Sequence, residues 1–235
     1  MRGLVTVLGI VLSAHARATT IVAIWTPVKL VISGDSLINS NWTVNGMPHH
    51  GISNDCKIRK FGTNYISAAG NYLIRAAGFD LWAMASNACG SSTSVDECTS
   101  RFSALLRYSL GRAASQREVQ LSVLVAGVQN GAPALDHITL MGSPQMRLRV
   151  QSESFRRGRQ KWGRVILGER GAIDRYEAEA ASTVTNTIQD QALSLVRVEA
   201  RALPQEVGAP FSTLAIVTAG EHWIIPGCCP SSCSK

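Results

Sequence analysis

The threonine at position 19 has the chemistry of a nucleophile if the residues before it are removed. Residues 1–18 have the features of a secretory signal peptide: Arg2, an apolar run over residues 4–12, and the small-residue pattern Ala16-Arg17-Ala18. Cleavage after this pattern would give Thr19 a free α-amine. Such a residue carries a nucleophile and a base together, since an α-amine titrates at roughly pH 7.7–8 and can take the hydroxyl proton.

The part of the chain after the leader has the length of one ordinary domain. Removing 18 of 235 residues leaves 217, which is enough for a sizeable apolar core. We expect a single domain over residues 19–235 that ends in a Cys-rich tail. A purely structural role for Thr19 stays open at this point, because residues 20–24 (TIVAI) are typical of a strand and a threonine can simply begin one.

The charge of the chain is basic but moderate. Residues 1–18 contain two of the 23 basic residues and no acidic one, so the rest of the chain has 21 basic and 16 acidic residues. The basic residues gather once, over residues 156–164 (RRGRQKWGR), without a nucleic-acid-binding motif, and a solvated loop is the better interpretation. Later apolar runs are too short to span a bilayer. We therefore expect neither a nucleic-acid partner nor a membrane-bound mature form.

Six cysteines follow the leader, and an even number in an exported chain favours disulfides. Cys89 and Cys98 flank a Gly/Ser/Thr-rich loop and form the most natural pair. The tail cysteines 228, 229 and 233 can pair with one another or with Cys56. Their spacing matches no zinc pattern, so the sequence favours disulfides over a metal site, and it indicates no cofactor.

Apolar periodicity divides the chain into strands and helices. A polar segment at residues 38–54 is typical of a loop. Strands are predicted at residues 20–24, 29–34, 57–61, 65–69, 120–128, 136–141, 147–151, 164–167, 212–218 and 222–225, and helices at 72–88, 96–114, 172–181 and 184–202. This order predicts an α+β fold in which two antiparallel sheets lie face to face between helix pairs, a four-layer αββα sandwich.

Four stretches in this order resemble proteasome β-type subunits. They are Thr19-Thr-Ile-Val, Ile-Ser-Gly-Asp35-Ser, Cys-Lys57-Ile-Arg-Lys-Phe and Ile-Ser-Ala-Ala-Gly70-Asn. Their spacing is most similar to the bacterial ring-protease peptidase of that family. The members are N-terminal nucleophile hydrolases with an αββα sandwich and a catalytic N-terminal threonine, so the resemblance implies the same fold and chemistry for residues 19–226.

The resemblance implies a role for each of four residues. Thr19 resembles the nucleophile and Lys57 the buried lysine beside it, whose charge lowers the pKa of the nearby amine. Asp35 resembles the carboxylate that holds this lysine, since a buried ammonium group needs a partner. Gly70 resembles the glycine whose backbone N–H forms the oxyanion hole.

The sequence also departs from the family pattern. Glu169 stands where the family has a serine that assists the amine, and it either replaces that serine or lies at the surface. Residues 204–208 (PQEVG) lack the family's Asp and Ser, and Leu37 stands near the place of an arginine. These differences bear on catalytic efficiency and leave the nucleophile, lysine and carboxylate in place.

Three functions remain open from the sequence. The first is a secreted or periplasmic threonine peptidase or amidase that cleaves peptide or protein substrates and assembles into a homo-oligomer such as a ring. The second is a non-catalytic relative that serves as a scaffold or binding protein. The third is a small-amide acylase of the wider superfamily. The first and third both require a free Thr19.

Processing of the leader is the first testable prediction. We expect the exported protein to begin at Thr19, because residues 16–18 fit signal peptidase and Thr19 fits the nucleophile. N-terminal sequencing and intact mass of secreted material measure this directly. A start at Thr20, Ile21 or any other residue would remove the catalytic assignment.

Overall fold

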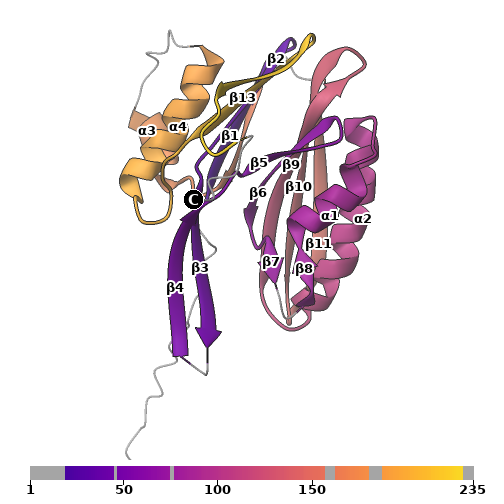
Figure 1. Cartoon of the computed structure of the whole chain (residues 1–235), viewed down its shortest axis with the longest axis vertical. Helices are drawn as coiled ribbons and strands as arrows, with labels where there is room; N and C mark the ends of the chain where they lie inside the picture. The colour runs from indigo at the N-terminus through magenta and orange to yellow at the C-terminus, as the bar shows by residue number, and fades with distance from the viewer. Residues whose placement is uncertain (1–18, 45–46, 75–76, 157–161, 180–186, 230–235) are drawn as a thin grey trace, which may run out of the picture.

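The computed structural model describes residues 19–44, 47–74, 77–156, 162–179 and 187–229 (Figure 1). The predicted leader, most of the basic cluster and Cys233 lie outside the described residues. Among the residues that are described, no helix has both the length and the apolar character needed to cross a membrane.

Two five-stranded sheets form the centre of the structure, and neighbouring strands within each sheet are antiparallel throughout. The first sheet has the order β12 (Gly163–Gly168), β1 (Thr20–Trp25), β2 (Lys29–Gly34), β13 (Ser212–Val217) and β14 (Gly220–Ile225). The second has the order β11 (Met146–Phe155), β10 (Ala132–Ser143), β9 (Val119–Gln129), β6 (Asn64–Gly70) and β5 (Ile58–Phe61).

Each sheet carries its own pair of helices (Figure 1). Helix α2 (Val95–Ala114) packs on β9, β10 and β11 of the second sheet and contacts α1 (Leu81–Cys89). Helix α4 (Ile188–Ala202) packs on β1, β2 and β13 of the first sheet and contacts α3 (Gly171–Glu179). The predicted α+β class with antiparallel sheets is confirmed.

The side chains of β1 alternate between the two faces of the first sheet, and this alternation places the sheet between the second sheet and α4. Ile21, Ala23 and Trp25 belong to an apolar cluster that includes residues of the second sheet, whereas Val22 and Ile24 pack in a cluster with α4. Successive side chains of a strand point to opposite faces, so a strand that is apolar at every position is buried on both sides. All six residues of β1 are buried.

The polar segment predicted as a loop is instead a hairpin of β3 (Leu37–Val44) and β4 (Met47–Asn54), which pair with each other. The prediction was wrong because it weighted the polar composition and not the Asn-Gly pair at positions 45 and 46, a strong hairpin signal between two strands. In Figure 1 the hairpin extends away from the two large sheets.

The helix predicted from residue 72 begins later than expected. Residues Leu73–Ile74 (β7) and Phe79–Asp80 (β8) form a short antiparallel pair, and α1 starts at Leu81. Gly78 has φ +65°, and the Asp80 side chain caps the helix by accepting from the backbone N–H groups of Trp82 and Ala83. Local capping therefore overrides the longer helical periodicity.

Two disulfides have both cysteines among the described residues. Cys89 and Cys98 join the end of α1 to the first turn of α2, with their Cα atoms 4.6 Å apart, as predicted. Cys56 and Cys229 join the residue before Lys57 to the segment after β14, with their Cα atoms 5.2 Å apart. The second pairing is the link between the tail and Cys56 that the sequence left open.

A buried glutamate ties α3 to α4 and yields a prediction about stability. Glu199 is 0 % exposed and accepts hydrogen bonds from the backbone N–H groups of Ala172 and Ile173, at 2.8 and 3.1 Å. Glu199→Ala leaves both buried donors without their acceptor, so we expect a loss of about 3 kcal/mol in the free energy of unfolding. Urea denaturation measures it, with Glu153→Ala at an exposed position as the control. A loss no larger than that of the control would contradict this role.

Candidate active site

The pairing of β1 with β2 brings two of the predicted site residues together. Thr19 lies directly before β1 and Asp35 directly after β2, and the antiparallel register pairs Ile21 with Gly34. The start of one strand therefore lies beside the end of the other. Lys57 comes from the second sheet, where it directly precedes β5.

Lys57 makes direct contacts with both residues. Its Nζ donates a hydrogen bond to Thr19 Oγ1 at 2.9 Å. The same nitrogen lies 3.0 Å from Oδ1 and 2.9 Å from Oδ2 of Asp35. Thr19, Asp35 and Lys57 are only 4 %, 2 % and 6 % exposed, so the ion pair and the hydroxyl are largely removed from water.

The backbone fixes the orientation of the Asp35 carboxylate. Oδ1 also accepts from Thr20 N–H at 3.0 Å, and Oδ2 accepts from Leu37 N–H at 3.1 Å and from Gly208 N–H at 3.5 Å. A buried carboxylate needs several donors to offset its loss of hydration. These donors come from three separate segments, so the position of Asp35 is set by the folded structure as a whole.

Burial shifts the pKa values of the ion pair in opposite directions. Desolvation raises the pKa of Asp35, while the charge of Lys57 and the hydrogen bonds to the carboxylate act against this rise. Desolvation lowers the pKa of Lys57, and the attraction of Asp35 opposes that change. A lysine with a lowered pKa in contact with a hydroxyl can both stabilise its alkoxide form and exchange a proton with it.

The loop that follows β12 holds the main chain of Thr19. Glu169 N–H donates to Thr19 O at 2.9 Å, and Thr20 Oγ1 donates to Glu169 O at 3.1 Å. Gly168 has φ +80°, and a Cβ atom there would lie 1.6 Å from Thr19 O. Only glycine, which has no Cβ atom, lets the Thr19 carbonyl oxygen lie this close to the backbone at position 168. Glu169 therefore contacts the site through its backbone, and a role for its side chain remains a proposal.

Gly70 lies at the end of β6, on the strand that faces this loop. Its φ is +107°, and a Cβ atom there would lie 2.3 Å from Gln120 O. The neighbouring Ala69 has its Cβ 3.3 Å from the position that a Gly168 Cβ would occupy. The backbone requires glycine at position 70, and this segment borders the start of β1. Its use as an oxyanion donor remains a proposal.

The departures from the family pattern have structural counterparts. Val207 is 0 % exposed, and the adjacent Gly208 and Leu37 supply backbone donors to Asp35. Main-chain donors thus occupy the segments where the sequence lacks the expected polar side chains. The sequence-based prediction missed these donors, because every residue except proline has a backbone N–H and the residue type carries no signal for its use.

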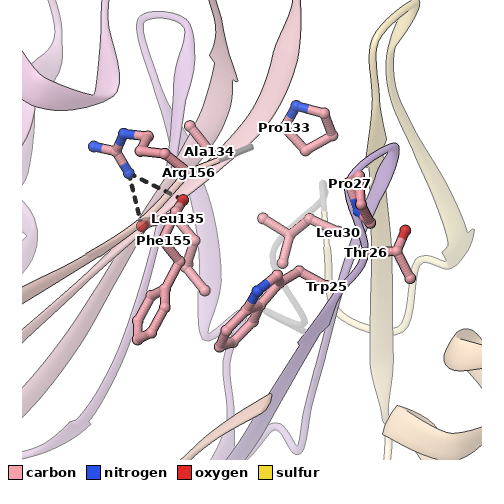
Figure 2. Close-up of a pocket in the computed structure, with 9 residues that line it drawn as sticks. All are labelled: Trp25, Thr26, Pro27, Leu30, Pro133, Ala134, Leu135, Phe155 and Arg156. Atoms are coloured by element: carbon pink, nitrogen blue, oxygen red, sulfur yellow. Dashed lines mark hydrogen bonds between the residues drawn. The ribbon is translucent and has the colours of Figure 1, made fainter. Parts of the chain in front are cut away.

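A small pocket lies at the opposite end of β1 (Figure 2). Trp25, Leu30 and Phe155 contribute to it, and Arg156 Nη1 donates to the carbonyl oxygens of Leu135 and Phe155 at 2.8 and 3.3 Å. The six residues of β1 separate this pocket from Thr19 by roughly 20 Å at about 3.3 Å per residue. It is therefore distinct from the Thr19 site.

The described residues contain no group of three or more His, Cys, Asp or Glu side chains able to hold a metal ion. The chemistry at the site is that of a hydroxyl, an ammonium group and a carboxylate, arranged around the first residue of the described chain.

Comparison with known proteins identifies the fold. No protein-family model matches the chain, and no curated protein matches it in sequence. Among solved structures, it is similar to Anbu (ancestral beta-subunit) from Yersinia bercovieri, with a TM-score of 0.54 and 18 % identity over 88 % of this chain and 87 % of that one. This similarity supports a proteasome-like fold, as the resemblance predicts, and at this identity it shows the fold alone.

The buried pair predicts unequal effects of two neighbouring lysines on stability. Lys57→Ala leaves the Asp35 carboxylate buried without its counter-charge, and we expect a loss of about 3–5 kcal/mol in the free energy of unfolding. Lys60→Ala removes a lysine whose side chain is 50 % exposed and whose partner is Glu221, so it should cost less than about 1 kcal/mol. Chemical denaturation of both variants compares them. Equal losses would contradict the buried ion pair.

Proposed function

We propose that this chain is an exported N-terminal threonine hydrolase that cleaves peptide or amide bonds, with Thr19 exposed by removal of residues 1–18. The proposed architecture is the four-layer αββα sandwich of N-terminal nucleophile hydrolases. One observation carries the proposal: Lys57 Nζ lies 2.9 Å from Thr19 Oγ1 while it is held by both carboxylate oxygens of Asp35. A threonine with only a structural role has no need of a buried ammonium group on its hydroxyl.

The proposed reaction uses the α-amine and the side-chain hydroxyl of Thr19 together. The free α-amine accepts the hydroxyl proton through a water molecule, and Oγ1 attacks the substrate carbonyl carbon. Lys57 stabilises the negative charge that develops on Oγ1, and its positive charge keeps the pKa of the amine low enough for it to act as a base. The leaving amine departs with the proton, and a water molecule then hydrolyses the acyl ester on Thr19.

Two further residues complete the proposed site. Gly70 N–H donates to the oxyanion of the tetrahedral intermediate, a role supported by its place at the strand end that borders Thr19. Glu169 takes the place of the family's assisting serine, because its backbone already holds Thr19 and its carboxylate can accept a hydrogen bond from the α-amine. No cofactor or metal ion takes part in this mechanism.

The surroundings proposed for this enzyme are oxidising. Two disulfides among the described residues are compatible with an extracellular or periplasmic location.

We further propose that the protein acts on peptide or protein substrates and forms a homo-oligomer. The proteasome-like fold suggests that this homo-oligomer is a ring. Light scattering of the purified protein tests the assembly separately from the activity.

A non-catalytic scaffold or binding protein is the second candidate, and a specific observation favours it. The segment where the family has an Asp and a Ser presents the buried apolar side chain of Val207. If the missing polar groups are essential, the site is intact in geometry and inactive. A third candidate, a small-amide acylase, uses the same Thr19 and differs from the peptidase in substrate.

Substitution of Thr19 tests the proposed function. Thr19→Ala should lower the rate of amide hydrolysis by about 10³-fold or more, because it removes the nucleophile. Thr19→Ser keeps the hydroxyl and the amine and should retain part of the activity. A panel of fluorogenic peptides and small acyl amides measures the rates and separates the peptidase from the acylase. The mass of each variant must first establish that it begins at residue 19.

The outcomes separate the candidates. Correctly processed wild-type protein that hydrolyses nothing in the panel would favour the scaffold. Hydrolysis that survives Thr19→Ala unchanged would place the nucleophile elsewhere.

A further inference from the structure

The three central residues of the site come from two different sheets. Thr19 and Asp35 border β1 and β2 of the first sheet, whereas Lys57 directly precedes β5 at the edge of the second. The contacts of Lys57 with Thr19 and Asp35 therefore depend on how the edge of one sheet is held against the other. The residue before Lys57 is Cys56, which forms a disulfide with Cys229.

Cys229 is anchored to the first sheet, close to Asp35. It follows β14, and its N–H donates to Pro226 O at 2.6 Å. The same carbonyl oxygen accepts from Ser212 Oγ at 2.9 Å, and Ser212 pairs in register with Gly34, the residue before Asp35. A Cβ atom on Gly227 would lie 2.4 Å from Phe211 O, so this turn packs tightly against the start of β13.

The disulfide thus joins a segment anchored beside Asp35 to the residue that precedes Lys57. We propose that the Cys56–Cys229 disulfide is a positioning element that keeps Lys57 in contact with Thr19 and Asp35, so that the site is fully assembled only in the oxidised protein. The inference about activity rests on the proposed function, but the inference about Lys57 does not, because its position can be measured without a substrate.

Non-covalent contacts also hold the segment around Cys56, and each is weaker than a covalent bond. Asp55 N–H donates to Ser36 O at 2.9 Å, at the base of the β3–β4 hairpin. Arg59 Nε donates to Cys56 O at 3.1 Å, and the Arg59 guanidinium pairs with Asp55. Both side chains of that ion pair are about one third exposed, at 31 % and 33 %, so solvent screens it. The covalent bond, with Cys229 0 % and Cys56 9 % exposed, is the stronger link between the two sheets at this point.

Reduction of this disulfide is a two-electron reaction. A dithiol reductant transfers two electrons and two protons to the sulfur atoms, which yields the Cys56 and Cys229 thiols and leaves the reductant as a cyclic disulfide. Burial of both cysteines requires local opening or mild denaturant for access, and the reoxidised protein should recover the original site.

The second disulfide supplies a matched control. Cys89 and Cys98 link α1 to α2 on the helix-covered side of the second sheet, and both are 0 % exposed. Neither cysteine adjoins a residue of the proposed site in sequence. Cys89→Ser/Cys98→Ser therefore removes a buried disulfide of the same chemistry without releasing Lys57.

Acetylation of lysines in the folded protein tests the position of Lys57. Lys57 is 6 % exposed and Lys60, three residues later in β5, has a side chain that is 50 % exposed, so Lys60 serves as the internal standard. Acetic anhydride labelling, followed by peptide mass spectrometry, gives the ratio of Lys57 to Lys60 modification. We expect this ratio to rise several-fold in Cys56→Ser/Cys229→Ser and in the reduced wild type, and to stay at the wild-type value in Cys89→Ser/Cys98→Ser.

Circular dichroism and thermal unfolding establish that each variant is folded under the labelling conditions. If the double serine variant does not fold, reduction and reoxidation of Cys89→Ser/Cys98→Ser, which lacks the other described disulfide, decide the question. A folded protein without the Cys56–Cys229 bond that protects Lys57 as well as the wild type does would overturn the inference.

Hydrolysis rates give the second measurement. Loss of the Cys56–Cys229 bond should lower kcat by about 100-fold, since a misplacement of about 1 Å can cost that much, and reoxidation should restore it. If the wild type shows no hydrolysis, the proposed function fails and the labelling ratio still decides the positioning role. If the wild type hydrolyses and the folded variant does so equally well, the positioning role fails and the function stands.

Discussion

The ion pair between Lys57 and Asp35 is buried between two sheets, and the rest of the site depends on how the fold offsets its cost. Removing an ammonium group and a carboxylate from water is expensive unless their geometry and additional hydrogen bonds compensate. Here Asp35 accepts from Lys57 and from the backbone of Thr20, Leu37 and Gly208. The remaining contact of Lys57 described at the site is with Thr19 Oγ1, so the hydroxyl completes the environment of the charge.

The surrounding structure restricts the positions of the site residues. The antiparallel register of β1 and β2 places Thr19 beside Asp35, and the loop at Gly168 and Glu169 holds the Thr19 carbonyl. The same loop leads into α3, whose first turn is held by the buried Glu199 of α4. Strands, loop and helices therefore restrain the threonine from several directions, which is the preorganisation that the proposed catalytic role would need.

Much of this arrangement could be predicted from the sequence, for identifiable physical reasons. Buried strands and long helices have strong periodicity, which predicts most of the elements of the two sheets and their helices. The spacing of Thr19, Asp35 and Lys57 resembles that of proteasome β-type subunits, and this resemblance predicts that the three side chains lie together. The hairpin after Asp35 was missed because its polar composition obscured the Asn-Gly turn signal. The backbone donors to Asp35 and the pairing of Cys56 with Cys229 depend on tertiary contacts between distant segments, which residue types alone do not encode.

The central claim is that Lys57 activates the hydroxyl of a Thr19 whose α-amine is free. An electrophile that captures the hydroxyl and the amine of an N-terminal threonine together tests it most directly, with the adduct located by peptide mass spectrometry. The account predicts a cyclic adduct on Thr19 in processed wild-type protein, formed much more slowly in folded Lys57→Ala and at the wild-type rate in Lys60→Ala. Processed, folded wild-type protein that forms no adduct, or a Lys57→Ala variant that reacts as fast as the wild type, would contradict it.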